Sequence, residues 1–287
     1  MDIDQARTFL AIVTHGSFLE ASRRLYLTQS TISARMLKLE AELGARLFIR
    51  NRAGTSLTPA GRRFLPHAKR LVLTAEQARD EVGLPERFRA TLRVGGRIAL
   101  WEGFLPQWVG WLRGAAADVA VRSEIGFEED LMRSLIEGTL DIGLMYTPSH
   151  SPGLIVEHLF DERLVLVSTR ADDKQPGGDY VYVEWGPGFY AQHAQSYPDL
   201  ERPAQVVNIG WLGVQLILQN GGSCFLPLRM AEPLIAAGRL YAVSDSPQYI
   251  QPVYVVYPRE NENPVLALAV QGLREHAAQY AHQSAPA

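Results

Sequence analysis

The sequence predicts an α/β protein: a small, mainly helical N-terminal domain followed by a larger body of alternating strands and helices. Its 287 residues are enough for about two domains with separate cores. Apolar residues recur at helical spacing in the first 60 residues, and β-rich runs alternate with helical ones from residue 91 onward. Residues 1–90 hold 15 Lys and Arg against 9 Asp and Glu, and the remainder holds 13 against 22. A basic head on an acidic body suits a head that meets a polyanion.

Two short helices joined by a tight turn are predicted near the N-terminus. Ser17 opens an S-x-x-E capping box, so we expect a helix from there to about Leu25. Thr28 is the next N-cap candidate and begins a second helix. Two helices separated by so short a turn match a helix-turn-helix, and the arginine-rich segment 45–57 has the pattern of a basic hairpin wing. The apolar stripe of the second helix comprises Ile32, Met36, Leu39 and Leu43.

A longer helix is predicted after the wing. Its apolar residues alternate at spacings of four and three for under three heptads, and Gly83 and Pro85 end it. Such a seam favours a dimerising helix, although a single helix packed on its own domain shows a similar stripe. The seam consists of Phe64, Ala68, Leu71, Ala75, Ala78 and Val82.

The body alternates strands with helices, which predicts parallel βαβ units that bind ligands at the carboxyl ends of their strands. Helices are expected around Leu105 to Leu112 and around Leu131 to Leu135, the latter ending at Gly138. The predicted strands are 91–94, 119–125, 141–146, 164–167, 180–183 and 253–257.

Several classes of protein are disfavoured by what the sequence lacks. It has no apolar run near the roughly 20 residues of a membrane helix and no secretory signal pattern, so we expect a cytoplasmic protein without membrane partners. It has one cysteine, no CxxC pair, and no GxSxG, HExxH or GxGxxG motif, so we expect no metal, no cofactor and no catalytic residue. Two alternatives remain open: a thiol redox-responsive regulator acting through Cys224, and a cytoplasmic enzyme.

A family resemblance covers nearly the whole chain. Residues 9–65, FLAIVTHGSFLEASRRLYLTQSTISARMLKLEAELGARLFIRNRAGTSLTPAGRRFL, resemble the winged helix-turn-helix of LysR-type transcriptional regulators. The resemblance continues in LRVGG, in EGTLDIGLM and in the segment 221–240. Within the family, VEWGP and GSCFLP are similar to the HdfR branch. The resemblance implies a linker helix and two Rossmann-like α/β subdomains of periplasmic-binding-protein type, with an effector cleft between them.

The implied function is that of a sequence-specific DNA-binding transcriptional regulator controlled by a small-molecule effector. Its implied partners are double-stranded DNA, a small anionic or aromatic effector, and copies of itself in a homotetramer, a dimer of dimers. The implied domains are a DNA-binding domain (1–58), a linker or dimerisation helix with hinge (59–90), and a regulatory domain (91–287) divided into subdomain I (91–161 and 266–287) and subdomain II (162–265).

Opposite the apolar stripe, the second helix of the helix-turn-helix presents short polar side chains that can enter a major groove, where glutamine can make a bidentate contact with adenine. Arginines of the wing and a threonine hydroxyl beyond it suit phosphate. The sequence departs from many relatives at Ala34 and Leu37, where they carry arginine, so their base specificity does not transfer. The candidate DNA-binding residues are Gln29, Ser30, Thr31, Ser33, Arg35, Lys38, Arg50, Arg52, Thr58 and Arg62.

Candidate effector residues lie in the loop after the first body strand and at cleft positions implied by the resemblance. Arg97 can bind a carboxylate bidentately, but Glu102, Glu124 or Glu128 can equally neutralise it from within the protein. Aromatic residues can line the cleft or simply pack. The candidates are Gly96, Arg97, Ala99, Trp101, Phe127, Glu128, Tyr146, Trp185, Asn208 and Ser223.

Overall fold

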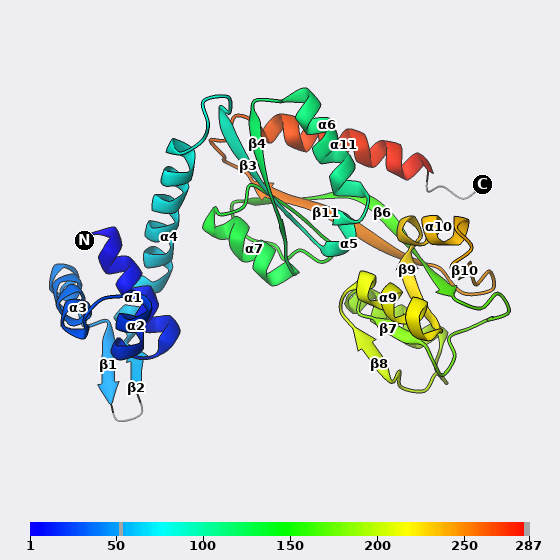
Figure 1. Ribbon diagram of the computed structural model, residues 1–287, viewed down its shortest axis with the longest axis horizontal. Helices are drawn as coiled ribbons and strands as arrows, with labels where there is room; N and C mark the ends of the chain where they lie inside the picture. The colour runs from blue at the N-terminus through cyan, green and yellow to red at the C-terminus, as the bar shows by residue number, and fades with distance from the viewer. Residues whose placement is uncertain (52–53, 284–287) are drawn as a thin grey trace. The chain divides into compact units, whose positions relative to one another are not determined.

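The computed structural model describes residues 1–51 and 54–283 (Figure 1). The chain divides into two compact units, Met1–Pro85 and Glu86–Ala287, each with a hydrophobic core of its own. The first unit is a helical bundle with a two-stranded hairpin, and the second is a mixed α/β unit. Both agree with the fold class that the sequence predicts.

The helix-turn-helix lies in the first unit and has the caps that the sequence predicts. The Ser17 hydroxyl accepts hydrogen bonds from the Leu19 and Glu20 amides, while the Glu20 carboxylate pairs with Arg23 instead of completing the capping box. Between the helices, Tyr26 adopts φ 55° and is 95% exposed. The helices are α1 (Ile3–His15), α2 (Phe18–Arg24) and α3 (Gln29–Leu43).

The core of this unit is centred on α1, which contacts α2, α3 and the long helix α4 (Pro59–Val82). The predicted stripe of α3 is right for Ile32, Met36 and Leu39, which are buried. It is wrong for Leu43, which is 41% exposed at the last residue of the helix. The period of 3.6 residues gives the face on which a residue lies but not whether another element covers that face, so periodicity alone cannot separate the two cases.

The wing is the antiparallel hairpin of β1 (Phe48–Asn51) and β2 (Gly54–Leu57), with Phe48 opposite Leu57. Directly after it, the chain makes a tight approach at Gly61. A Cβ on Gly61 would lie 2.2 Å from the carbonyl oxygen of Leu47, so only glycine fits there. The Gly61 position thus fixes how α4 leaves the wing.

Helix α4 packs on its own unit through the first half of the predicted seam. Phe64 and Ala68 are buried in the core, whereas Ala78 is exposed and Val82 is 88% exposed. The N-terminal half of the seam is therefore used within the unit, and the C-terminal half leaves apolar side chains open.

The second unit consists of two lobes threaded by two long antiparallel strands, β6 (Leu154–Ser168) and β11 (Tyr249–Pro258). Their pairing changes register between Val253 and Tyr254, and the predicted subdomain boundary after residue 161 falls within β6. In Figure 1, these strands run from one lobe into the other. We refer below to the first lobe and the second lobe.

The first lobe is built on parallel strands, because β3 pairs in parallel with both β4 and β5. The helices α6 and α11 contact one another and help to bury its core. Its elements are β3 (Ala90–Gly96), α5 (Ile98–Trp101), α6 (Phe104–Ala115), β4 (Val119–Ile125), α7 (Glu128–Glu137), β5 (Ile142–Met145) and α11 (Leu266–Gln283).

The second lobe contains the parallel pair β7 and β8 and the strand β9, which pairs antiparallel with β6. The expectation of parallel βαβ units is thus right for β3–β5 and β7–β8 but wrong for the strands that link the lobes. Its elements are β7 (Val181–Val183), α8 (Pro187–Ser196), β8 (Gln205–Val207), α9 (Gly210–Asn220), β9 (Ser223–Pro227), α10 (Leu228–Ala236) and β10 (Tyr241–Ala242).

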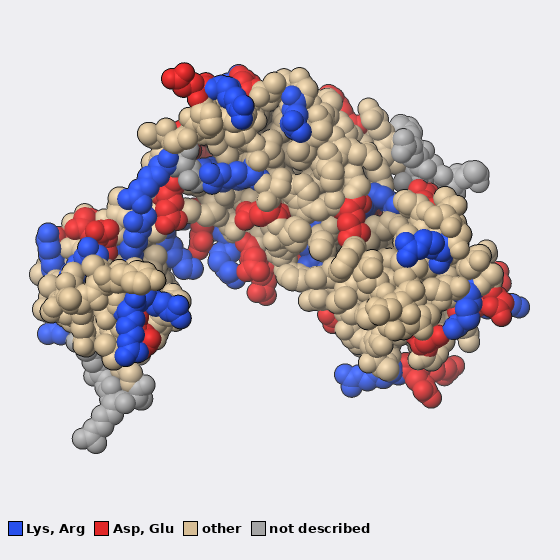
Figure 2. All heavy atoms as spheres, viewed as in Figure 1, with Lys and Arg blue, Asp and Glu red and all other residues tan. Residues whose placement is uncertain are grey.

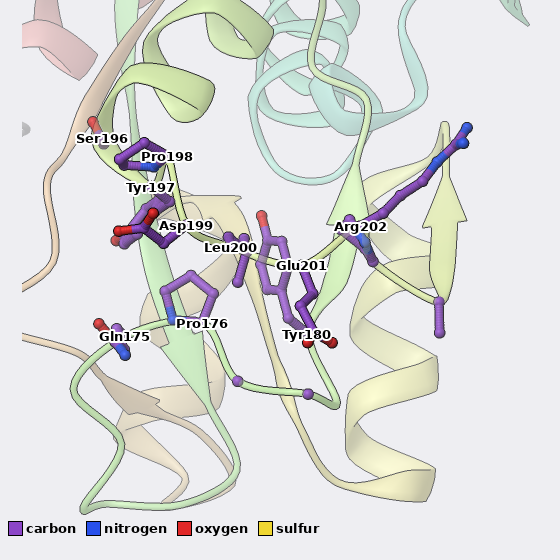
Figure 3. A pocket seen from close by; sticks show the side chains of 14 residues that line it. Gln175, Pro176, Tyr180, Ser196, Tyr197, Pro198, Asp199, Leu200, Glu201 and Arg202 are labelled. Atoms are coloured by element: carbon purple, nitrogen blue, oxygen red, sulfur yellow. The ribbon is translucent and has the colours of Figure 1, made fainter.

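A cavity of about 430 Å³ opens at the amino ends of β7 and β8, between the segments 175–178 and 196–204 (Figure 3). Tyr180 forms part of its wall. Trp185 and Asn208 follow the same two strands at their carboxyl ends, so this cavity lies at the opposite edge from those predicted effector residues. Across the described helices, none combines the length and apolar character needed to cross a membrane.

Candidate functional site

The first turn of α3 presents the short polar surface that the sequence predicts. Thr28 caps the helix by accepting a hydrogen bond from the Thr31 amide at 3.2 Å, and its hydroxyl lies 2.8 Å from those of Ser30 and Thr31. Gln29 and Ser30 are exposed, while Thr31 and Ser33 are half-buried. Because the cap bonds order these hydroxyls, the turn is a defined hydrogen-bonding surface before any ligand arrives.

Two basic residues on α3 differ in how they are held. The Arg35 guanidinium donates to the Asp4 carboxylate at 3.0 Å and to the Thr8 hydroxyl at 3.3 Å, which ties α3 to α1. Lys38 is exposed. Arg35 thus has a structural role within the unit, whereas the Lys38 ammonium lies in solvent.

Two other candidates around the start of α4 also have partners. The Thr58 hydroxyl donates to the Arg46 carbonyl at 2.7 Å and accepts from the Gly61 amide at 2.9 Å, so it is the N-cap of α4. Arg62 is exposed and donates to the Leu57 carbonyl at 2.9 Å. These bonds give the segment 58–62 (TPAGR) a structural role, because they connect the wing to the start of α4.

The wing carries the last two candidates. Arg50 lies in β1 opposite Thr55, and Arg52 lies outside the described residues. Figure 2 shows Lys and Arg side chains along α4 on the face that it presents. The first unit is therefore a basic helix-turn-helix with an antiparallel wing, the shape and charge of a DNA-binding module.

In the second unit, four predicted effector residues come together around Arg97. Its guanidinium lies 3.2 Å from the Glu128 carboxylate and 4.4 Å from the centre of the Phe127 ring. Its Nη2 also points to the backbone carbonyl of Asn208 at 3.5 Å. Gly96 lies directly before it, where a Cβ would be 2.7 Å from Leu105. Of the three carboxylates considered for Arg97, the structure selects Glu128.

Burial shapes the electrostatics of this cluster. The Arg97 side chain is 10% exposed, and its Nε atom has no hydrogen-bond partner among the described residues. Burial raises the pKa of the nearby Glu124 carboxyl, and it raises that of Glu102 against the opposing charge of Arg229. The cluster is therefore a buried arginine with one carboxylate partner and with capacity for a further acceptor.

The predicted aromatic lining is largely committed to structure. The Trp101 indole donates to the Glu124 carbonyl at 3.0 Å, and the Trp185 indole donates to the Phe225 carbonyl at 2.9 Å. Trp185 also packs so closely on Gly210 that a Cβ there would lie 2.5 Å from its ring. Phe127, 41% exposed and under the Arg97 guanidinium, is the aromatic candidate that a ligand can reach.

A buried ion pair that sequence reasoning missed lies beside the cluster. Arg229 on α10 binds Glu162 on β6 through Nε at 2.8 Å and also through Nη2. The Tyr146 hydroxyl donates to the other Glu162 oxygen at 2.8 Å, and Arg229 donates to the Ala99 carbonyl at 2.8 Å. Little in the sequence signals this pair, because Glu162 lies between Asp161 and Arg163 in β6 and only the structure shows that its charge is buried and requires a partner.

Ser223 and Asn208 do not join the cluster through their side chains. Ser223 is fully buried at the start of β9, paired with Ser168, and its hydroxyl has no partner in the described part of the chain. The Asn208 residue is exposed, and it is its backbone carbonyl that meets Arg97. Ala99 also takes part through its backbone carbonyl, which accepts a hydrogen bond from Arg229 and not from Arg97.

Cys224 lies in β9 and is completely buried. Burial raises the pKa of its thiol well above the ordinary value, so very little reactive thiolate is present near neutral pH. Within the described residues, no group of three or more His, Cys, Asp or Glu side chains is arranged to hold a metal ion.

Comparison with known proteins places both units. Residues 3–62 match the family model for bacterial regulatory helix-turn-helix proteins of the lysR family, and residues 85–176 match the LysR substrate binding domain. HdfR, an HTH-type transcriptional regulator, is 29% identical in Yersinia enterocolitica over 93% of this chain and 94% of its own. The Escherichia coli HdfR is 31% identical over 93% of this chain and 95% of its own.

A solved structure supports the same fold over the full length. CbnR, a LysR family transcriptional regulator crystallised in full length with its target DNA, matches with a TM-score of 0.70 at 21% identity, over 96% of this chain and 100% of its own. The resemblance that the sequence predicts is confirmed, including its similarity to HdfR. The chain belongs to the LysR family of DNA-binding transcriptional regulators.

Proposed function

We propose that this regulator reads DNA through the first turn of α3 and responds to a small anionic effector at the Arg97 cluster. The observation that carries the DNA-reading role is the division of α3 into two faces. Ile32, Met36 and Leu39 are buried, while Gln29 and Ser30 stand exposed on a capped turn. Short polar side chains at the start of a recognition helix allow close approach to base edges in the major groove. The protein would act in the cytoplasm.

The test compares Gln29→Ala with Lys38→Ala on duplexes selected by the wild-type protein from a random library. We expect Gln29→Ala to weaken binding to the selected site by about tenfold or more, with little change on random DNA. Lys38→Ala should weaken both and lower the salt slope by about one. Equal losses on both DNAs for Gln29→Ala would refute base reading by Gln29.

The effector role draws support from what surrounds Arg97. A buried guanidinium whose Nε–H has no partner among the described residues can donate from Nε, together with the neighbouring Nη2, to a carboxylate or another anion in a bidentate mode. Phe127 beside it can pack against an apolar or aromatic body. Because Glu128 already neutralises the arginine through Nη1, an anionic effector competes with that carboxylate for the charge of Arg97, and this competition would provide the switch.

Assembly would use the open part of α4. The exposed Ala78 and Val82 continue the seam whose first half is buried, so pairing two α4 helices would cover them. We expect a dimer of dimers in solution, and Val82→Glu should reduce the mass measured by light scattering. An unchanged mass would exclude this part of α4 from the interface.

A further inference from the structure

Two arginines cross between the lobes of the second unit in opposite directions, and both end on backbone carbonyls. Arg97 precedes α5 in the first lobe and points to the Asn208 carbonyl in the second lobe at 3.5 Å. Arg229 in the second lobe donates to the carbonyls of Ala99, at 2.8 Å, and Glu102. The segment 97–102 is therefore held to the second lobe at both of its ends.

The Arg229 contacts are buried and mutually dependent. The side chains of Arg229 and Glu162 are 8% and 2% exposed, and Glu162 also accepts from Tyr146. Separating the two would leave an unpaired charge out of reach of water, which is strongly unfavourable. The stem of Arg229 also lies over Gly103, 3.5 Å from where a Cβ would stand, at a residue with φ +115°. Nothing in this arrangement opens without breaking several interactions together.

The Arg97 contact across the lobes is different in kind. Its 3.5 Å length is at the limit of a hydrogen bond. The charge of Arg97 is balanced by Glu128 within its own lobe, so losing the Asn208 carbonyl leaves no unpaired charge. The two ends of the segment are thus attached with very different strength.

We propose that Arg229 is a positioning residue that fixes α5 as a pivot between the lobes, and that the Arg97 contact with Asn208 is the end that opens. The role of an effector in that opening rests on the proposed function. The pivot does not, because Arg229 and Glu162 hold α5 in the protein alone.

Hydrogen exchange in the full-length protein without added ligand tests the pivot. The reporters are the amides of Leu100 and of Glu102, the C-cap of α5, which bond to the carbonyls of Arg97 and Ala99 respectively. In the double variant Arg229→Met/Glu162→Gln, which leaves no buried charge behind, these amides should exchange about tenfold faster. Arg97→Gln should change the exchange rates of these two amides by less than about twofold. It should accelerate exchange of the Gly213 amide, which bonds to the carbonyl of Ile209, the residue after Asn208.

The matched control removes a comparable ion pair on the same strand. Arg274 binds Glu157 of β6 through two bonds, at 2.7 and 2.8 Å, but on the more exposed side facing α11. Arg274→Met/Glu157→Gln should leave exchange in α5 within about twofold of the wild type. Equal acceleration by both double variants would overturn the pivot, because it would indicate general loosening.

Unchanged exchange in Arg229→Met/Glu162→Gln would also overturn it. If that variant does not fold, Arg229→Lys keeps a charge for Glu162 but lacks the extended fork by which Arg229 reaches Glu162 through Nε and Nη2 and the two carbonyls through Nη1, so α5 should still exchange about threefold faster. If Arg97→Gln accelerates amide exchange in α5 as much as the double variant does, the Arg97 and Arg229 attachments are equally strong and the proposal is contradicted. If no anion binds at Arg97 but the exchange results are as expected, the proposed effector role is wrong and the pivot is supported.

Discussion

The Arg97 guanidinium is neutralised by the Glu128 carboxylate 3.2 Å away, over the ring of Phe127. The two charged residues come from different elements, since Arg97 precedes α5 and Glu128 begins α7. A carboxylate at the start of a helix is favoured by the helix dipole, and an external anion would be favoured there for the same reason. Glu128 is therefore an internal competitor for the anion that we propose binds at Arg97.

Removing this internal competitor should strengthen the binding of an anion. In Glu128→Gln, Arg97 loses its carboxylate partner but keeps Phe127 beneath it. The probe is benzoate, which should bind this variant about five- to tenfold more tightly than the wild type, because it no longer competes with the free energy of a partly buried ion pair. Thermal shift against benzoate concentration measures this change.

Arg97→Gln provides the control, because it removes the anion's partner and should abolish the benzoate shift. Benzylamine has a similar size with the opposite charge and should give no larger shift in Glu128→Gln than in the wild type. Equal benzoate responses in all three proteins would remove Arg97 and Glu128 from the effector site.

The fold of the first unit could be predicted closely because its signals are local. The caps at Ser17 and Thr28 act within one helical turn, and the α3 stripe depends on spacings of three and four residues along one helix. The prediction for Leu43 was wrong because burial at the last residue of α3 depends on whether another element covers it, which is a tertiary property. Arg35 shows the same limit, since its bond to Asp4 joins residues 31 positions apart.

The candidate effector site was predictable only in part, for related reasons. Gly96 and Arg97 could be predicted because they lie at the end of a parallel strand and in the loop that follows it. Of the three carboxylates that could neutralise Arg97, Glu128 is its partner. Arg229 and Glu162 were missed because their pairing spans 67 residues and joins α10 to a strand that links the lobes. Charge spacing along a sequence contains no information about such pairs, whereas burial of a charge demands one.

Gly61→Ala should selectively destabilise the first unit. The added Cβ would lie 2.2 Å from the Leu47 carbonyl oxygen, and a backbone atom cannot move away without disturbing its own hydrogen bonds. We therefore expect the free energy of unfolding to fall by about 2 kcal/mol or more. All five Trp residues lie in the second unit, so urea unfolding followed by circular dichroism should show the change while Trp fluorescence does not. In Gly110→Ala, a helical glycine with open space, we expect about 0.5–1 kcal/mol of stabilisation instead. Similar outcomes for both would refute the steric argument.

His193 should make the second unit sensitive to acid. Burial lowers its pKa from 6.5 to about 4, and its Nε2 lies 3.0 Å from the Tyr180 hydroxyl. Between these two pKa values the unfolded chain binds more protons than the folded one, so stability is complete above pH 6.5 and falls as the pH drops toward 4. We expect a loss of about 2 kcal/mol at pH 4.5 relative to pH 7, measured by urea unfolding.

The variant that isolates this effect is His193→Gln, which keeps a polar partner for Tyr180 and does not titrate. Its loss of stability between pH 7 and 4.5 should be smaller than that of the wild type by about the same 2 kcal/mol. His150→Gln, at an exposed position, should match the wild type at both pH values. If His193→Gln instead follows the wild-type curve, other groups dominate the acid sensitivity.

Cys224 should behave as a packing residue and not as a redox switch. It is completely buried and burial raises its thiol pKa, so both access and thiolate are missing. As the single cysteine it can be followed alone: a disulfide reagent should label the native protein at least about a hundredfold more slowly than the urea-unfolded chain. Hydrogen peroxide should leave DNA affinity unchanged in the wild type and in Cys224→Ala. Peroxide-dependent DNA binding that disappears in Cys224→Ala would establish the redox alternative, because no other thiol is available to respond.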